Sequence, residues 1–147
     1  MRLWLFANPV SSIDRDNAAM SIFTHICLGT NDIRRAIDFY NAVLAPLGIR
    51  NLGCFLDQGV GYGRQVAEFL VLTPLDGAAA LPGNGGTVSF KAPDKRAVQA
   101  FHAAGLAAGG HDAGEPGVRG AVKGAFGAYL RDPDGNKICA YFFPKVS

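Results

Sequence analysis

The stretch Arg131-Asp132-Pro133-Asp134-Gly135-Asn136-Lys137 lies near the C-terminus of the 147-residue chain. Its Asp-Pro-Asp-Gly core has strong turn chemistry, because proline pre-sets φ at the first central position and glycine accepts a positive φ. Short apolar runs flank this turn, Phe126 to Leu130 before it and Ile138 to Phe143 after it. The stretch therefore predicts an antiparallel hairpin that closes the chain.

An internal repeat places this hairpin in a larger pattern. The run Ile22–Leu28 predicts a strand, and Asp32 is a helix N-cap that apolar residues follow at helical spacing. Asp94 and Phe101 in the second half repeat Asp32 and Phe39 at an equal offset. Further strands are predicted at Ile49–Phe55, Val60–Arg64 and Val66–Thr73, and then at Thr87–Ala92, His111–Val118, Ala125–Arg131 and Ile138–Phe143.

The repeat predicts an α+β fold built from two βαβββ modules, at about 20–76 and 85–145. A loop rich in alanine, glycine and proline, Pro74 to Gly86, separates them. One helix covers one face of each small sheet, so the two sheets form a paired, curled mixed sheet around a cavity lined by alternate strand residues. We expect residues 20–147 to form this single domain.

Composition narrows the class of protein. Half of the residues are hydrophobic, 49%, which suffices for a core, and no apolar run is long enough to cross a membrane. The net charge of +2 comes from scattered lysines and arginines, which argues against nucleic acid as the main partner. Three cysteines without CxxC spacing indicate free thiols in a reducing compartment, and we expect a cytoplasmic protein.

The first nineteen residues differ in character from the rest of the chain. Met1 to Ala7 contains an apolar run that is too short for a signal-peptide core, and Asn8 to Ala19 is polar. Met20 directly precedes the first predicted strand. Two interpretations stay open: an upstream extension with Met20 as the true start, or an ordinary N-terminal arm packed on a neighbour.

The doubled βαβββ pattern resembles the vicinal oxygen chelate superfamily, which contains glyoxalase I, extradiol dioxygenases, and fosfomycin- and bleomycin-resistance proteins. The residues that carry the resemblance are Thr24-His25-Ile26-Cys27-Leu28-Gly29, Asp32 and Phe39-Tyr40 in the first half, and Phe90 through Phe101-His102, Gly109-Gly110, Pro116-Gly117-Val118-Arg119 and the hairpin stretch Arg131 to Ile138 in the second. The similarity covers residues 20–144. It implies a ligand cavity and a homodimer.

The resemblance also implies metal or acid/base positions on the strands that face the cavity. His25 and Glu68 match two of them, while Thr87 and Cys139 stand where the family usually has histidine and glutamate. A set of His25, Glu68 and Cys139 suits Zn²⁺, and Ni²⁺ or Mn²⁺ are further divalent candidates. The replacements favour a site that is metal-free or binds metal weakly, because a threonine hydroxyl is a poor ligand. The two-histidine Fe(II) triad is harder still to build, because neither His102 nor His111 falls where a ligand is expected, so we discount dioxygenase chemistry.

Other side chains have both a functional and a purely structural interpretation. Tyr62, Tyr141, Thr87 and Cys139 are predicted to contact a ligand, and Tyr129 is a further cavity candidate, although aromatic core filling explains the tyrosines equally well. Arg64 and Arg119 either pair with an anionic substrate or lie solvated on the surface. His102 follows a core phenylalanine and is expected on the solvated flank of the second helix.

The sequence supports two functions of different classes. The first is a glyoxalase/bleomycin-resistance-like protein that binds a small organic molecule between the modules and acts as a lyase or isomerase on adjacent oxygens, with His25 and Glu68 as acid/base or ligand groups. The second is a metal-free protein that sequesters a drug or metabolite without catalysis. The replacements at Thr87 and Cys139 favour the second, and His25 with Glu68 keeps the first open.

Overall fold

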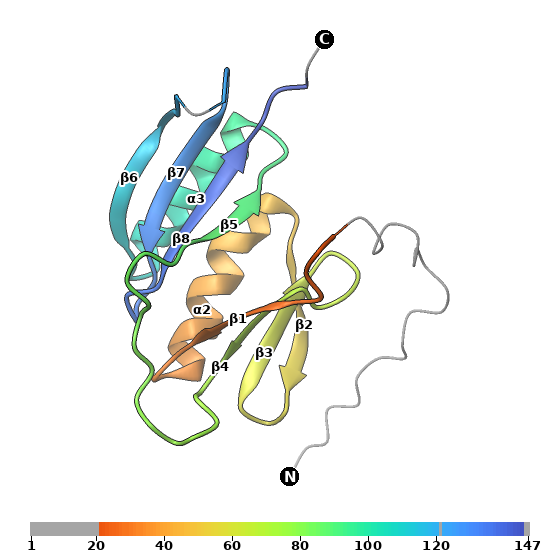
Figure 1. Ribbon diagram of the computed structural model, residues 1–147, viewed down its shortest axis with the longest axis vertical. Coiled ribbons are helices and arrows are strands. Elements are labelled where there is room, and N and C mark those ends of the chain that lie inside the picture. Colours follow the sequence, from red (N-terminus) through yellow and green to blue (C-terminus); the bar gives the residue numbers. More distant parts are fainter. Residues whose placement is uncertain (1–20, 121, 146–147) are drawn as a thin grey trace.

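The computed structural model describes residues 21–120 and 122–145, which form two βαβββ modules (Figure 1). Residues 1–19 and Met20, for which an extension and an alternative start are predicted, lie outside the described residues. Module one comprises β1 (Ile26–Gly29), α2 (Ile33–Leu44), the 3₁₀ turn η1 (Ala45–Leu47), β2 (Arg50–Phe55), β3 (Gly59–Gly63) and β4 (Phe69–Leu72). Module two comprises β5 (Val88–Lys91), α3 (Lys95–Ala107), β6 (His111–Val118), β7 (Phe126–Arg131) and β8 (Lys137–Phe142).

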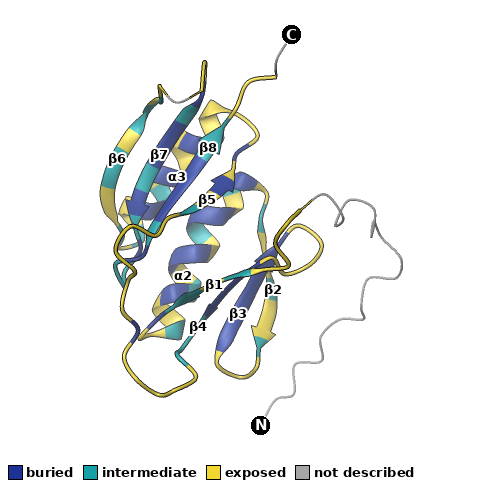
Figure 2. Ribbon diagram, in the orientation of Figure 1, coloured by how far each residue is buried: buried dark blue, intermediate teal, exposed yellow. Residues whose placement is uncertain are grey.

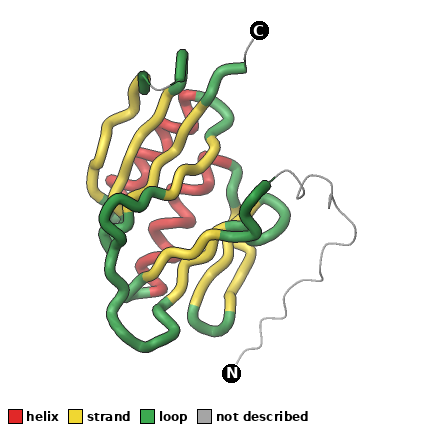
Figure 3. Tube along the Cα trace, viewed as in Figure 1, coloured by secondary structure: helices red, strands yellow, loops and turns green. Residues whose placement is uncertain are grey.

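Each module has its own four-stranded mixed sheet. The strand orders β1-β4-β3-β2 and β5-β8-β7-β6 are equivalent, and in each sheet the first pair is parallel and the others antiparallel. The helices lie on one side of the two sheets (Figure 3). This confirms the predicted α+β fold of two βαβββ modules, although the two sheets stay separate and do not close on each other.

The helices begin and end where their capping residues predict. The side chain of Asp32 accepts a hydrogen bond from the Arg35 N–H, and that of Asp94 accepts one from the Ala97 N–H. Gly48 ends the first helical segment in the left-handed region with φ of 72°. Asp and Gly are favoured at these positions because one supplies an acceptor and the other has no Cβ to clash.

Alternate strand residues divide each sheet into a helix-covered face and an open face. In β8, Ile138 and Ala140 belong to the core cluster, whereas Cys139 and Tyr141 point to the opposite face. The core is continuous between the modules, with the rings of Phe69 and Phe90 5.0 Å apart in an edge-to-face contact. The linker between the modules is mostly exposed (Figure 2).

Two strands begin later than the apolar pattern predicts. β1 begins at Ile26 because its partner β4 begins only at Phe69, and these two residues are the first pair of the parallel ladder. Before Phe69 the chain makes a tight turn in which the Glu68 N–H donates to the Tyr62 carbonyl at 2.9 Å. The turn keeps Val66 out of the sheet and leaves it exposed.

His102 is not solvated, which corrects the sequence-based expectation. Its residue exposure is 7%, and its ring nitrogen Nε2 lies 2.7 Å from Asp112 Oδ1. The helix flank that carries His102 is covered by β6, where Asp112 is the second residue. A buried imidazole is accommodated here because a carboxylate satisfies it.

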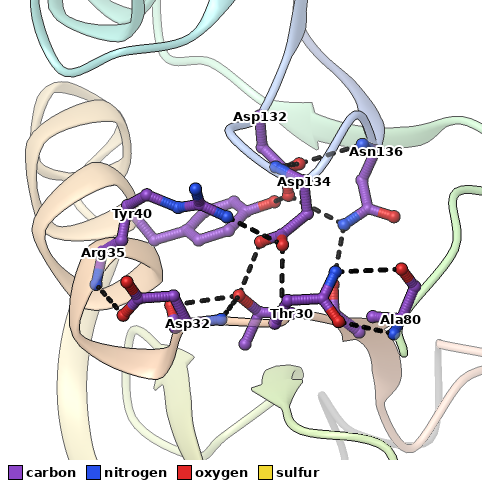
Figure 4. A network of polar contacts seen from close by, with 10 residues as sticks. Thr30, Asp32, Arg35, Tyr40, Ala80, Asp132, Asp134 and Asn136 are labelled. Carbon is purple, nitrogen blue, oxygen red and sulfur yellow. Dashed lines mark hydrogen bonds and ion pairs between the residues drawn. The ribbon is translucent and has the colours of Figure 1, made fainter. Parts of the chain in front are cut away.

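The predicted turn forms, and it also joins the two modules (Figure 4). The Gly135 N–H donates to the Asp132 carbonyl, and Asp134 Oδ1 accepts from the Asn31 N–H at 2.9 Å and from Arg35 Nη2 at 3.0 Å. Asp132 Oδ2 accepts from the Tyr40 hydroxyl at 2.6 Å. We call the hydrogen bonds and the ion pair that Asp132 and Asp134 make with module one the clasp. The clasp attaches the closing hairpin of module two to α2 of module one.

Candidate functional site

A cleft of about 170 Å³ lies between the two modules. Strands β1 and β5 both contribute to its walls, and each of them is an edge strand that pairs on one side only, with β4 and β8 respectively. The cleft therefore lies where neither sheet continues into the other. We call it the inter-module cleft.

The floor of the inter-module cleft is aromatic and aliphatic. The aromatic residues Tyr62, Phe69 and Phe90 are all buried, so packing in the core fixes the positions of their rings. The apolar lining residues are Phe23, Ile26, Ile49, Tyr62, Phe69, Val88 and Phe90. Phe23 is 60% exposed and adds an apolar group at the edge of the cleft. Such a floor accepts the apolar body of a small organic ligand.

The rim of the cleft is polar and carries charges of both signs. Arg64, Glu68 and Lys91 all line it, and all three residues are exposed. Arg64 is fixed by its Nη2 atom, which donates to the Leu47 carbonyl at 3.0 Å and to the Lys91 carbonyl at 3.4 Å. The guanidinium thus bridges the two modules beside the cleft.

Besides Arg64, the sequence-predicted site residues Tyr62 and Glu68 line the inter-module cleft. The Tyr62 hydroxyl donates to Asn41 Oδ1 at 3.0 Å, so helix α2 engages the phenol while the ring lines the cleft. Burial, and secondarily the nearby Asp38 carboxylate, raises the pKa of Tyr62. The phenol therefore stays protonated at neutral pH.

His25 and Thr87 do not line this cleft. His25 is exposed, and its Nδ1 lies 3.0 Å from the Thr24 hydroxyl. Its backbone neighbour Ile26 bonds to the Glu68 carbonyl at 2.9 Å, so His25 and Glu68 stand at the starts of adjacent strands. Within residues 21–120 and 122–145, no ion pair joins the two side chains. Thr87 is exposed just before β5.

Cys139 and Tyr141 lie on the open face of the second sheet rather than in the cleft. Cys139 is 2% exposed, and burial raises the pKa of its thiol above the usual value. Its register partner on β5 is Ser89, which does line the cleft. The Tyr141 hydroxyl lies 2.7 Å from that of Tyr129. Sequence alternation places these two β8 residues on one face of the sheet, but it does not show whether they lie on the cleft side of the neighbouring strand β5.

The side chains do not fit the divalent metal centre that the family resemblance implies. Across the described part of the chain, no three histidine, cysteine, aspartate or glutamate side chains gather closely enough to hold an ion. His25, Glu68 and Cys139 are thus not brought together as a ligand set. A metal site normally needs at least three protein ligands, and we derive no reaction step through a metal.

Ser89 and Lys91 are cleft residues that are not among the predicted site residues. Both lie on β5, where the polar residues Ser89 and Lys91 alternate with the apolar Val88 and Phe90. This alternation was the available signal, since it marks a strand with one buried face and one polar face. The family motifs point to Thr87 instead.

A protein-family profile matches most of the chain. Residues 22–140 match the profile described as the Glyoxalase/Bleomycin resistance protein/Dioxygenase superfamily. The chain belongs to this superfamily. A superfamily structure, a glyoxalase/bleomycin resistance protein from Albidiferax ferrireducens T118, is 42% identical, with a TM-score of 0.77 over 84% of this chain and 100% of that one.

More distant solved structures share the superfamily fold alone. A lactoylglutathione lyase from Agrobacterium tumefaciens is 22% identical with a TM-score of 0.57, covering 84% of this chain and 93% of that one. A glyoxalase-related enzyme from Fulvimarina pelagi is 22% identical with a TM-score of 0.63, covering 85% and 89%. No functionally curated protein matches the chain. No helix within the described residues is long and apolar enough to span a bilayer.

Proposed function

We propose that this superfamily member binds a small organic molecule in the inter-module cleft without a metal ion. The observation that carries the proposal is the cleft itself, with its aromatic floor and charged rim. Its volume of about 170 Å³ is below the roughly 300–1,000 Å³ of pockets for drug-sized ligands. The ligand is therefore a metabolite-sized molecule with an apolar body and a polar group that reaches the rim.

The polar rim supports binding more directly than catalysis. Among the described residues, Glu68 is the one carboxylate of the rim, while Arg64 and Lys91 supply two positive charges and Ser89 a hydroxyl. General acid–base catalysis needs a side chain that can gain or lose a proton within hydrogen-bond reach of the reacting atoms. Arginine stays protonated, so Arg64 serves as an anchor for an acceptor group of the ligand.

A substitution that fills the cleft tests this proposal. Thr24 lines the cleft and is exposed, so Thr24→Trp places an indole in the cleft without disturbing the core. Thr87→Trp is the matched control, because Thr87 is exposed outside the cleft. Ligand-observed NMR with a set of small aromatic compounds should give binders that Thr24→Trp loses and Thr87→Trp keeps. Binders that survive both substitutions equally would rule out the cleft as the site.

The second candidate function is a lyase or isomerase. It is supported by His25 and Glu68, which stand at the starts of the adjacent strands β1 and β4. The Agrobacterium lactoylglutathione lyase is related at the level of the fold. An assay with the hemithioacetal of methylglyoxal and glutathione, with Zn²⁺, Ni²⁺ or Mn²⁺ added, would show turnover that His25→Ala and Glu68→Gln abolish. Absence of turnover in wild type would leave binding as the function.

We also propose a cytoplasmic homodimer. The compartment is supported by three free cysteines, two of them exposed, because exposed thiols persist in reducing surroundings. The dimer is supported by exposed apolar side chains outside the cleft, such as Leu75 and Leu81. Analytical ultracentrifugation at micromolar concentration tests the dimer.

A further inference from the structure

The open face of the second sheet carries phenols and positive charges outside the inter-module cleft. The hydroxyls of Tyr129 and Tyr141 lie 2.7 Å apart, and their rings meet edge to face at 5.9 Å. The Arg119 guanidinium carbon lies 5.6 Å and the Lys137 amine nitrogen 5.1 Å from the centre of the Tyr129 ring. We call these four side chains the phenol–cation cluster. Arg119 directly follows β6 and Lys137 begins β8, the two strands that flank β7.

Glycines make room for the cluster. A Cβ added at Gly127 would lie 3.0 Å from two carbons of the Tyr141 ring, and one added at Gly117 would lie 3.2 Å from Arg119 Nη1. Neither of these glycines has a positive φ, so backbone conformation does not demand glycine there. Their contribution is space, which lets Tyr141 and Arg119 lie against the sheet.

The guanidinium of Arg119 is anchored but not neutralised. Its Nη2 donates to the Glu115 carbonyl at 2.6 Å and its Nη1 to the Val118 carbonyl at 3.5 Å. Arginine has five N–H donors, so others remain available for a ligand. Among the described residues, neither Arg119 nor Lys137 forms an ion pair with a carboxylate. The cluster therefore presents uncompensated positive charge.

Tyr129 is neutral at physiological pH. The hydrogen bond with Tyr141, followed by burial, raises the pKa of Tyr129 to about 12. Burial also raises the pKa of the neighbouring Cys139 thiol. Two phenols carry two O–H groups and use one in their mutual hydrogen bond, so one donor is free for an acceptor. Phenol and guanidinium thus offer donors to the same negatively charged group.

A hollow of about 220 Å³ adjoins the cluster. It is lined by Ser89, Val122, Ala125, Tyr141 and Phe143. The rings of Tyr141 and Phe143 stack 5.5 Å apart at 17°, which gives the hollow a flat aromatic wall. An apolar group bound there would contact the same tyrosine whose hydroxyl belongs to the cluster.

We propose that this open face is a second binding site, for a small carboxylate with an aromatic body. The carboxylate accepts hydrogen bonds from Arg119 and the free phenol, a geometry that suits the planar fork of a guanidinium. Lys137 adds a second positive charge, and the aromatic body packs on Tyr141 and Phe143 in the hollow. The site shares only Ser89 with the lining of the inter-module cleft, so the two sites can be tested separately.

Benzoate is the probe, and titration followed by ¹H–¹⁵N NMR is the experiment. We expect saturable shifts at the amides of Gly114, Gly117 and Gly127, and weaker binding of benzyl alcohol, which lacks the charge. Arg119→Gln should weaken benzoate binding by about tenfold or more, because it removes a charged donor. Tyr141→Phe should weaken it several-fold, while Arg34→Gln, which removes an exposed charge from α2 in module one, should leave it unchanged.

Other results would overturn the second site. One is a lack of saturation by benzoate in wild type. Another is equal weakening by Arg119→Gln and Arg34→Gln, which would show only general charge attraction. A third is displacement of benzoate by inorganic phosphate together with unchanged benzoate affinity in Tyr141→Phe. That result would show a bare anion site without an aromatic component. Thr24→Trp should not affect benzoate binding, so failure of the cleft proposal and failure of this one are distinguishable.

Discussion

His102 and Asp112 show how one polar pair connects helix α3 to strand β6. The His102 side chain is 9% exposed and that of Asp112 is 49% exposed. An ionised carboxylate can only accept, so the imidazole Nε2 donates across the 2.7 Å contact. Asp112 Oδ1 also accepts from the Gly114 N–H at 3.0 Å. The carboxylate thus satisfies a buried ring and shapes the irregular start of β6 at the same time.

The pair predicts an acid-dependent stability. The hydrogen bond from His102, and then that from Gly114, lowers the pKa of Asp112 below its usual 3.8. A carboxyl whose pKa is depressed in the folded state stabilises the fold at pH values above its unfolded-state pKa. This contribution is lost as the pH falls through the folded-state pKa. We therefore expect Asp112→Asn to lower the Tm at neutral pH. The Tm difference from wild type should become smaller below pH 3.8.

Calorimetry from about pH 7 down to the acid limb of unfolding checks this dependence. Glu115→Gln is the control, because Glu115 is an exposed carboxylate on the same strand. A Tm difference for Asp112→Asn that does not change with pH would contradict the prediction. So would an identical pH profile for Glu115→Gln.

The sequence could not reveal this pair because its geometry depends on an irregular strand. The register of β6 shifts between Asp112 and Gly114, so alternation does not fix the face to which Asp112 points. The sequence predicts a solvated flank for His102 because it follows the core residue Phe101. Helical periodicity locates the core, but it does not show which strand covers the neighbouring face.

At the scale of elements, helices were predicted more closely than strands. The caps Asp32 and Asp94 are local signals, and both helices begin directly after them. The start of a strand depends on whether a partner strand runs beside it, which is not a local property. β1 and β4 therefore both begin later than their apolar runs, at Ile26 and Phe69.

The turn between β3 and β4 provides an element-scale prediction. A Cβ at Gly63 would lie 1.7 Å from the Val66 carbonyl oxygen, which is backbone and cannot rotate away. Gly63→Ala must therefore open the turn that brings Glu68 to the rim of the inter-module cleft. We expect a loss of more than about 2 kcal/mol in the free energy of unfolding, in the range of overpacking substitutions.

Urea unfolding measures this loss. Gly83→Ala in the linker is the matched control, since a Cβ there meets no atom within 4 Å. The control should change stability by no more than about 1 kcal/mol, because removing a glycine mainly restricts the unfolded chain. Equal stability of the two variants would show that the turn is looser than its contacts imply.

At the scale of the whole molecule, the sequence predicted two modules but not what holds them together. Local chemistry predicts the Asp-Pro-Asp-Gly turn, and the turn forms. Its long-range contacts have no local signal: Asp134 bonds to Thr30 across 104 residues, and Asp132 bonds to Tyr40 across 92. The candidate site was only partly predictable for the same reason, because Lys91 and Arg64 meet in space only after the modules join.

The clasp predicts that one carboxylate of this turn stabilises the joined modules. The Asp134 side chain is 3% exposed, and it accepts hydrogen bonds from the Thr30 hydroxyl, the Asn31 N–H and the Arg35 guanidinium. Asp134→Ala would leave the buried Thr30 hydroxyl without this acceptor, and we expect it to cost about 1–3 kcal/mol in the free energy of unfolding. Arg35→Ala should cost at most about 1 kcal/mol, because its side chain is 46% exposed and solvent screens the ion pair.

Urea unfolding of both single variants and the double variant separates these contributions in a double-mutant cycle. Arg34→Ala is the control for Arg35→Ala, because it removes an exposed arginine at the adjacent position of α2. Most of the loss in Asp134→Ala should persist when Arg35 is already alanine, since the Thr30 and Asn31 hydrogen bonds do not involve the guanidinium. If Asp134→Ala costs no stability in the Arg35→Ala background, the stabilisation comes from the ion pair and not from the clasp as a whole.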